Sequence, residues 1–115
     1  MKIEKLGEDG AGIYKSFRIL KAYPGDEVVV KRVGKKWEVE RIVREGEHRG
    51  KIKCKHFWEC NACIWQGMKY KSQLFFKEKF VRELFGECEK IEPSPKIWHY
   101  RNKMELAFID GKIGY

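Results

Sequence analysis

The sequence predicts an α+β fold that is mostly β with one main helix. Three observations lead to this prediction. Residues 1–48 contain short β-branched and aromatic stretches separated by Gly and Pro turns. After a group of cysteines, apolar residues recur at three- and four-residue spacing, as in a helix. The last residues alternate again and contain Asp-Gly, a tight hairpin signal. We therefore expect a small five-stranded barrel, a cysteine loop, a helix and the first hairpin of a second, incomplete domain.

The strands of the barrel can be placed from the turns between them. Residues 3–6 are expected to form a first strand, and residues 12–20 a second extended segment. Residues 23–26, Tyr-Pro-Gly-Asp, are a turn, because Pro presets φ and Gly takes the positive φ that follows. Residues 27–32 are rich in Val, and residues 37–44 alternate after a Gly turn. In this last strand we expect Trp37, Val39 and Val43 on one face and Glu38, Glu40 and Arg44 on the other.

Basic residues accompany these strands. The protein has 25 Lys and Arg against 17 Asp and Glu, which gives a formal net charge of +8. Such an excess favours an anionic partner, most commonly nucleic acid. We expect an RNA-facing surface on the barrel, formed by Lys31, Arg32, Lys35, Lys36, Arg41 and Arg44.

Three cysteines follow within ten residues, as Cys54-x5-Cys60-x2-Cys63. This spacing allows three thiolates to face one metal ion or cluster. Basic side chains nearby stabilise thiolates, and aromatic rings exclude water. Two disulfides are the alternative, but the start of the chain has no apolar signal core, which favours the cytosol and reduced thiols. The basic residues near the cysteines are Lys51, Lys53 and Lys55, and the aromatic ones are Phe57, Trp58 and Trp65.

The cysteines are framed by a linker and a helix. Residues 45–53 are polar with two glycines and are expected to be a linker, whereas residues 66–85 are expected to be helical. Pairs at i,i+4, Glu78–Arg82 and Lys79–Glu83, support the exposed side, and Gly86 ends the helix. The expected core stripe comprises Tyr70, Leu74, Phe76, Phe80, Val81, Leu84 and Phe85.

The last part of the chain is expected to be a hairpin. Apolar and polar residues alternate over residues 99–108, and Asp110-Gly111 precedes a return strand over residues 112–115. A return strand of only four residues leaves one edge of the hairpin unpaired, and we therefore expect a larger part of the domain to follow Tyr115. No stretch is apolar enough to cross a membrane. Neither a phosphate-binding Gly loop nor a Ser-His-Asp set is recognisable, and no nucleophile stands apart from the cysteine group unless it is Cys88.

These segments together resemble the N-terminal part of the RNA uracil-C5 methyltransferases, which form 5-methyluridine and carry an iron–sulfur cluster. Residues 1–48, with Ala-Tyr-Pro-Gly-Asp before three valines, resemble a TRAM domain, a small OB-like barrel implicated in RNA binding. Pro95 and residues 98–105 resemble the strand that opens the family's central domain. Between the second and third cysteines the family usually has Gly-Gly, where this chain has Asn61-Ala62. The resemblance to the cluster motif rests on the three cysteines with Trp65, Gln66, Tyr70, Gln73, Leu74 and Lys77 after them.

The resemblance implies three units: a TRAM-like RNA-binding barrel at 1–48, an iron–sulfur loop and helix at 49–98, and the start of an incomplete central β domain at 99–115. It implies a [4Fe–4S] cluster whose fourth ligand lies beyond Tyr115, since Cys88 stands where the family has no ligand. S-adenosylmethionine and the catalytic residues would belong to a C-terminal domain outside this chain. The implied cluster ligands are Cys54, Cys60 and Cys63, and the implied RNA contacts are Lys51, Lys53, Lys55 and His56, with Arg101 and Lys103 as second choices.

The implied protein is a cytoplasmic enzyme of tRNA or rRNA, monomeric, or continuous with or docked to a methyltransferase domain. The absence of Thr and the few Gln and Asn fit a heat-adapted source. Two other interpretations use the same residues. A stand-alone zinc-dependent RNA-binding module would use the three clustered cysteines with Cys88, or with His56 in place of one of them. A ferredoxin-like electron carrier would use the same cluster to transfer electrons to an anionic partner.

Overall fold

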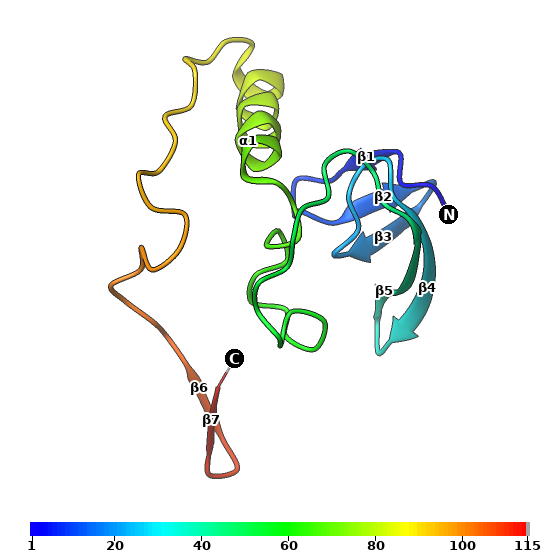
Figure 1. Ribbon diagram of the computed structural model, residues 1–115, viewed down its shortest axis with the longest axis vertical. Helices are drawn as coiled ribbons and strands as arrows, with labels where there is room; N and C mark the ends of the chain where they lie inside the picture. The colour runs from blue at the N-terminus through cyan, green and yellow to red at the C-terminus, as the bar shows by residue number, and fades with distance from the viewer. Residues whose placement is uncertain (115) are drawn as a thin grey trace.

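The computed structural model describes residues 1–114 of the chain. Figure 1 shows a small β unit with α1 beside it, a long loop below the helix, and a coil that runs along the opposite side to a terminal hairpin. The five-stranded sheet and the single helix of this described part confirm the predicted α+β class. The elements are β1 (Lys5–Leu6), β2 (Gly12–Tyr14), β3 (Phe17–Leu20), β4 (Glu27–Val33), β5 (Lys36–Arg44), α1 (Tyr70–Phe85), β6 (Ala107–Ile109) and β7 (Lys112–Gly114).

The first five strands form a sheet that closes on itself. The strand order is β1-β2-β3-β5-β4, with β3 parallel to β5 and the other neighbours antiparallel. The residues before β1 join the other edge, because Lys2 pairs with Glu27 and the Ile3 amide donates to the Asp26 carbonyl at 2.8 Å. These bonds close the sheet at the start of β4. This arrangement agrees with the small five-stranded barrel expected from the sequence.

The barrel core is apolar and small. Its buried residues are Ile3, Ile19, Ala22, Val28 and Val39. The predicted Tyr-Pro-Gly-Asp turn is confirmed: the Asp26 amide donates to the Tyr23 carbonyl at 3.0 Å, and Gly25 has φ 89°. Gly46 packs directly on this turn, where a Cβ atom would lie only 2.6 Å from the carbonyl carbon of Gly25. The turn and the segment that follows β5 therefore pack against each other backbone to backbone.

Residues 12–20 form a hairpin and not one extended segment. Strands β2 and β3 pair with each other, and Tyr14 lies opposite Phe17. The two-residue connection places Lys15 in the left-handed region with φ 52°. Such turns normally carry Gly, Asn or Asp. The prediction missed the reversal because the connection, Lys15-Ser16, contains none of these residues.

A β-bulge in β5 reverses part of the predicted alternation. Val30 pairs with Val39 and Val29 with Arg41, so Glu40 is an extra residue without a partner in β4. A bulge of this kind shifts the inward and outward positions by one residue. As a result Ile42 packs against the core, and Val43 is 56% exposed. The placement of Val43 on the buried face was therefore wrong.

The helix begins later and buries less than the sequence predicts. Helix α1 starts at Tyr70, not at residue 66, and its predicted end is confirmed by Gly86, which has φ 80° and donates to the Arg82 carbonyl at 2.8 Å. Phe76 packs against Leu6 of the barrel, and Phe80 lies beside this contact. Three members of the expected stripe, Val81, Leu84 and Phe85, are exposed by 42%, 66% and 77%. The prediction that this stripe forms one continuous core was therefore wrong.

The two predicted i,i+4 ion pairs on α1 had different outcomes. Lys79 lies 4.0 Å from Glu83, as expected. Within residues 1–114, Glu78 forms no ion pair with Arg82 and accepts a hydrogen bond from the Ile91 amide. The segment after the helix therefore attaches to Glu78.

The predicted strand over residues 99–108 is mostly coil. Only Ala107–Ile109 forms a strand, and His99 has φ 57°, which interrupts an extended chain. The Asp-Gly hairpin itself is confirmed, with φ 51° at Asp110 and 73° at Gly111, the values of a type I′ turn. The extended tail raises the radius of gyration to 15.4 Å, against about 13 Å for a compact chain of ~100 residues. Among the described residues, no helix has the length and apolar character needed to cross a bilayer.

Candidate nucleic-acid interface and cysteine loop

A short β-bridge closes the segment that carries the cysteines. Arg49 pairs with Met68 in antiparallel fashion. The Gly50 amide donates to the Gly67 carbonyl at 2.8 Å, and the Lys69 amide donates to the His48 carbonyl at 2.9 Å. Residues 50–67 therefore leave the barrel and return to the same place, and we call them the cysteine loop. Figure 1 shows this loop hanging between the barrel and the coil.

Hydrogen bonds inside the cysteine loop bring its two arms together. The Cys54 amide donates to Gln66 Oε1 at 2.8 Å, and the Gln66 amide donates to the Cys63 carbonyl at 3.0 Å. The Cys60 amide donates to the His56 carbonyl at 2.8 Å, which forms a turn at the tip. Gln66 thus ties the backbone of the first cysteine to that of the third. This gives a structural role to one of the residues on which the family resemblance rests.

Two more residues of that motif dock the loop onto the rest of the protein. Trp65 Nε1 donates to the Gly10 carbonyl of the barrel at 3.1 Å. Gln73 Nε2, from the first turns of α1, donates to the carbonyls of Trp65 and Met68 at 3.1 and 3.2 Å. The loop is therefore attached to both the barrel and the helix through side chains that lie after the cysteines.

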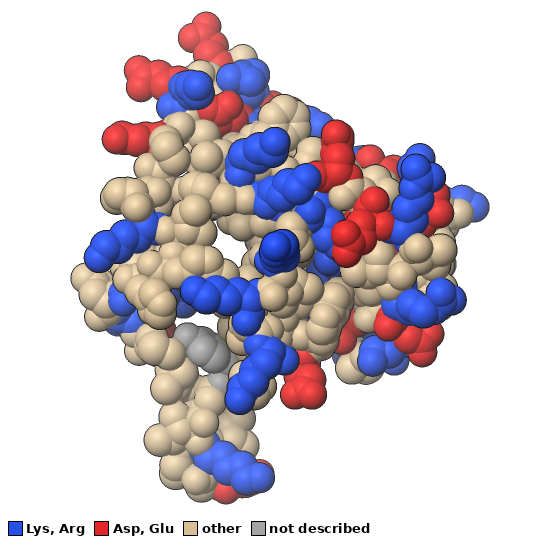
Figure 2. Space-filling model, viewed as in Figure 1, with Lys and Arg blue, Asp and Glu red and all other residues tan. Residues whose placement is uncertain are grey.

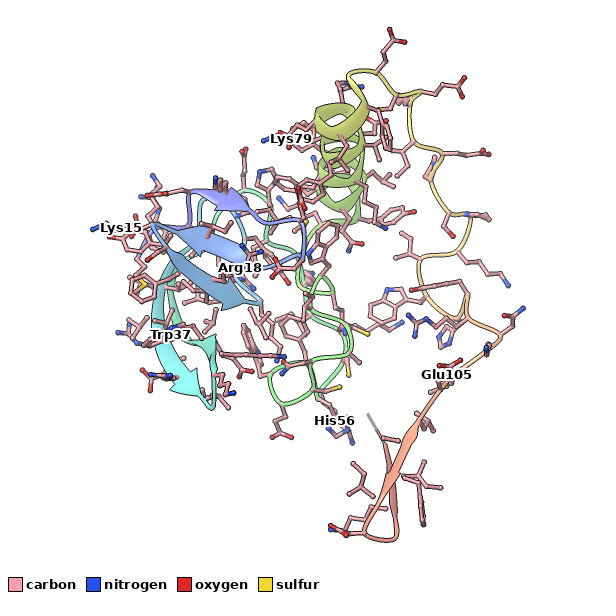
Figure 3. All side chains as sticks on the ribbon, turned by 180° about the vertical axis from the view of Figure 1, so that it is seen from behind. Lys15, Arg18, Trp37, His56, Lys79 and Glu105 are labelled. Atoms are coloured by element: carbon pink, nitrogen blue, oxygen red, sulfur yellow. The ribbon has the colours of Figure 1, made fainter. Side chains whose placement is uncertain are left out.

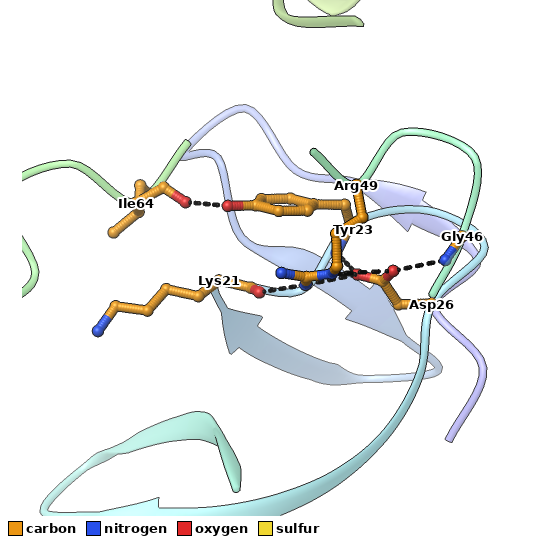
Figure 4. A network of polar contacts seen from close by, with 6 residues as sticks. All are labelled: Lys21, Tyr23, Asp26, Gly46, Arg49 and Ile64. Carbon is orange, nitrogen blue, oxygen red and sulfur yellow. Dashed lines mark hydrogen bonds and ion pairs between the residues drawn. The ribbon is translucent and has the colours of Figure 1, made fainter. Parts of the chain in front are cut away.

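A buried ion pair fixes the stem of the loop to the barrel (Figure 4). Arg49 Nη2 lies 2.7 Å from Asp26 Oδ2, and the two side chains are 1% and 0% exposed. The same nitrogen donates to the Lys21 carbonyl at 2.8 Å. Asp26 also accepts from the amides of Tyr23 and Gly46, each at 2.8 Å. The description of residues 45–53 as a polar linker was therefore wrong at Arg49, which belongs to the core.

Two buried side chains of the barrel, Tyr23 and Lys21, donate hydrogen bonds to backbone carbonyls of the cysteine loop. Tyr23 is buried, and its hydroxyl donates to the Ile64 carbonyl at 2.6 Å. Burial raises the pKa of Tyr23 well above its ordinary value, so it stays a donor. Lys21 is 1% exposed and donates from Nζ to the Trp58 carbonyl at 3.1 Å; burial lowers its pKa. Figure 4 shows the Lys21 side chain pointing away from the ion pair while its carbonyl faces Arg49.

The three clustered cysteines carry free thiols on this tied loop. Cys54 and Cys63 are exposed, and Cys60 is partly buried. Three thiols on one short loop are the donor type that zinc and iron–sulfur clusters use. Within residues 1–114, however, no three His, Cys, Asp or Glu side chains are placed to hold a metal ion together. The donor types fit such a centre, and the metal site stays a prediction.

Cys88 is not brought to the other cysteines. It follows the end of α1, and its thiol lies 3.6 Å from the Glu78 carbonyl. The cysteine loop joins α1 at Tyr70, eight residues before Glu78, which is about 12 Å along the helix axis. Figure 1 shows the cysteine loop extending away from α1 on the side opposite to the end of the helix.

The predicted RNA contacts all lie on the surface. Lys51, Lys53, Lys55 and His56 are exposed on the first arm of the cysteine loop, and Figure 3 shows His56 at the tip, away from Lys79 on the helix. Arg101 and Lys103 are exposed on the coil, where Lys103 pairs with Glu105 at 3.0 Å. The predicted barrel set, also exposed, comprises Lys31, Arg32, Lys35, Lys36, Arg41 and Arg44.

Charge is distributed unevenly over the face seen in Figure 2. Basic side chains form a band over the middle of this face, and acidic side chains lie both at the end where α1 stops and over the barrel at the right. The sequence after α1 contains Glu87, Glu89 and Glu92. Acidic side chains repel a polyanion, and basic ones attract it, so the middle of this face is its more favourable part for an anion.

Comparisons with known proteins point to one enzyme family. The chain is 38% identical, over 97% of its length, to a 23S rRNA (uracil(747)-C(5))-methyltransferase of Pyrococcus furiosus. It is 43% identical, over 94% of its length, to an uncharacterized RNA methyltransferase of Nanoarchaeum equitans. It is 37% identical, over 98% of its length, to a tRNA (uracil(54)-C(5))-methyltransferase of Pyrococcus abyssi. No family model matches the chain.

A solved structure agrees with these similarities. The crystal structure of the Pyrococcus abyssi tRNA (uracil-54, C5)-methyltransferase, in complex with S-adenosyl-L-homocysteine, matches 99% of this chain with a TM-score of 0.74 and 34% identity. The match covers 28% of that protein, and the three curated relatives are covered by 29%, 25% and 29%. The chain thus spans less than a third of the length of the relatives that it matches.

Proposed function

We infer that this chain is part of an RNA uracil-C5 methyltransferase that acts on tRNA or rRNA in the cytoplasm. The observation that carries this inference is similarity along nearly the whole chain to enzymes that share one reaction, methylation of uracil at C5, on two kinds of RNA. The shared shape with one of them supports it. The methyl donor is then S-adenosylmethionine, since S-adenosyl-L-homocysteine in the solved relative is what remains of that donor after methyl transfer.

The task of these 115 residues within the enzyme is to bind RNA. We assign the barrel, at residues 1–48, to a TRAM-like RNA-binding unit, residues 49–98 to the loop and helix, and residues 99–115 to the start of a central β domain. The excess of positive charge and the exposed lysines on the cysteine loop support this role. Methyl transfer itself belongs to residues outside this chain, so the chain alone should not be catalytic.

Cys54, Cys60 and Cys63 are proposed to hold a [4Fe–4S] cluster, whose fourth ligand comes from outside the chain. Their shared loop, tied through Gln66, supports this assignment. The cluster supplies no redox step in this proposal; the chain's residues hold it so that the loop presents its lysines in one arrangement. Cys88, beside the Glu78 carbonyl, is not a ligand in this proposal.

RNA binding tests the first part of the proposal. The association constant for a fluorescent tRNA transcript should fall linearly with salt on a logarithmic plot, because each phosphate contact releases counterions. Replacing Lys51, Lys53 and Lys55 together by Gln should weaken binding and flatten that slope by about two to three units. The matched control replaces three exposed lysines elsewhere, Lys90, Lys96 and Lys112, by Gln. Equal effects of both triple changes would contradict the assignment of the loop lysines.

The reaction and the cluster are tested separately. The whole enzyme that contains this chain, incubated with S-adenosylmethionine and unmodified RNA, should form 5-methyluridine, detected by mass spectrometry of nucleosides. Anaerobically purified protein should be brown and contain iron and sulfide, whereas a zinc protein would be colourless. Cys60→Ser should lose the metal and Cys88→Ser should keep it. Retention by the first variant, or loss from the second, would contradict the ligand assignment.

A further inference from the structure

A shallow depression lies beside the stem of the cysteine loop. Its volume is about 660 Å³. Its apolar lining is Ile42 of β5, Ile52 and Trp58, and its charged lining includes Lys51, Lys69 and Glu45. None of Ile42, Ile52 and Trp58 belongs to the predicted RNA contacts. We propose that this depression binds one unstacked base of single-stranded RNA together with an adjoining phosphate, an inference that rests on the RNA-binding role proposed above.

Trp58 provides the surface on which a base would stack. Its side chain is 42% exposed, although its backbone is fixed by the hydrogen bond from the buried Lys21. The Trp58 ring packs edge-to-face on Phe57, with ring centres 4.9 Å apart. The guanidinium carbon of Arg49 lies 6.0 Å from the centre of the Trp58 ring. Phe57 and Arg49 are themselves buried. Trp58 is therefore an exposed ring on a rigid support, which reduces the entropy lost when a base stacks on it.

The charged residues around the depression suit a nucleotide. Lys51 and Lys69 are exposed and stand where the two arms of the stem meet α1. Lys69 is the N-cap of α1, and the first turn of this helix contains no acidic residue. The positive end of the helix and two ammonium groups thus favour a phosphate at this side of the depression. Glu45 can accept a hydrogen bond from an N–H group of a base.

The combination favours single-stranded RNA over a duplex or a protein. Bases in a duplex are stacked on one another and do not offer a free face, whereas looped-out bases stack on aromatic side chains. The net charge of +8 and the two lysines that line the depression favour a polyanion over an apolar peptide. An aromatic surface beside lysines is the combination that binds single strands with little sequence preference.

Binding of short oligonucleotides tests the depression. The probes are a fluorescent five-residue oligouridylate and an abasic ribose-phosphate oligomer of the same length and charge, measured by anisotropy with the 115-residue chain. The oligouridylate should bind more tightly. Trp58→Leu should weaken its binding by about 5- to 150-fold, the value of one stacked base, and should leave the abasic oligomer unchanged. Trp58→Tyr should restore most of the affinity, because a tyrosine ring also stacks.

Trp98 offers a matched control. It is 40% exposed and has Lys53 Nζ 5.0 Å from its ring centre, but it does not line the depression. Trp98→Leu should change neither probe, and far-ultraviolet circular dichroism should show that all variants are folded. Equal binding of the two probes by the unaltered chain, or an equal loss from Trp58→Leu and Trp98→Leu, would overturn the proposed base site. Salt-dependent tRNA binding would survive that result, whereas absence of all RNA binding would overturn the proposed function as well.

Discussion

Arg49 Nη2 donates to Asp26 Oδ2 at 2.7 Å, in a position almost completely shielded from water. This contact joins the turn before β4 to the stem of the cysteine loop, 23 residues further along the chain. Arg49 also lies over the Tyr23 ring, 4.5 Å from its centre. Its Nη1 atom has no hydrogen-bond partner among the described residues.

The first prediction concerns this ion pair. Arg49→Met should lower the free energy of unfolding by about 3–5 kcal/mol, because it leaves the Asp26 carboxylate buried without its counter-charge. Adding Asp26→Asn should recover part of that loss. Urea denaturation followed by circular dichroism measures both values. Lys79→Met, at the exposed Lys79–Glu83 pair, is the control and should change stability by no more than about 0.5 kcal/mol. A loss that small in Arg49→Met would show that the pair does not hold the stem.

The second prediction concerns the Tyr23 hydroxyl. Tyr23→Phe keeps the ring and removes the hydrogen bond to the Ile64 carbonyl. We expect a loss of about 1–3 kcal/mol, because that carbonyl is left without its donor. Amide hydrogen exchange should become faster in residues 60–68 and stay unchanged in β4 and β5. Tyr14→Phe is the control, since Tyr14 is partly exposed on β2. Uniformly faster exchange over the whole barrel would mean that Tyr23 supports the core and not the loop.

The third prediction tests the bulge in β5. Ile42→Ser should destabilise the protein by at least about 1 kcal/mol, because Ile42 packs against the barrel core. Val43→Ser should change stability by no more than about 0.5 kcal/mol, because Val43 faces solvent. Both are measured by thermal or urea unfolding. The reverse order would place Val43 inside, as unbroken alternation predicts, and would exclude the bulge at Glu40.

The fourth prediction concerns pH. Arg18 lies against Asp9, and its hydrogen bonds hold the pKa of the Asp9 carboxyl below its ordinary value of 3.8. Because the pKa of Asp9 is lower in the folded than in the unfolded chain, the pair stabilises the folded state fully at pH values above the unfolded pKa. This stabilisation is lost as the pH falls through the folded pKa. Nuclear magnetic resonance titration of Asp9 should show the low value, and Arg18→Ala should return it toward 3.8. An unchanged titration in the variant would exclude Arg18 as the cause.

The fifth prediction concerns Gln66 and the proposed metal site. Gln66→Leu removes the acceptor of the Cys54 amide and so releases the first cysteine from the third. The chain should then bind Co²⁺ less tightly, as measured by the thiolate-to-cobalt absorption bands, with secondary structure unchanged. Gln66→Glu keeps an acceptor and should behave more like the unaltered chain. Equal Co²⁺ affinity in all three proteins would show that the bond does not organise the cysteines.

Local patterns in the sequence were sufficient for features that depend on local backbone chemistry. Gly25, Gly86 and the Asp110-Gly111 pair predicted a turn, a helix end and a hairpin. All of these residues have the positive φ angles that such features require. The class of fold followed from the same signals. The Lys15-Ser16 turn escaped prediction because neither residue type favours such a conformation, and only pairing of β2 with β3 imposes it.

Tertiary structure decided whatever depends on distant partners. The sequence shows three cysteines and a band of lysines, but Arg49 looks like another basic residue in a polar stretch. It becomes a core residue only because Asp26 lies buried opposite it, and this pairing positions the stem that carries the cysteine loop. The exposed ring of Trp58 likewise depends on Lys21 and Phe57 beneath it. Spacing along the chain specifies turns, because a turn is made by its own residues, whereas burial is specified by contacts between segments that only folding brings together.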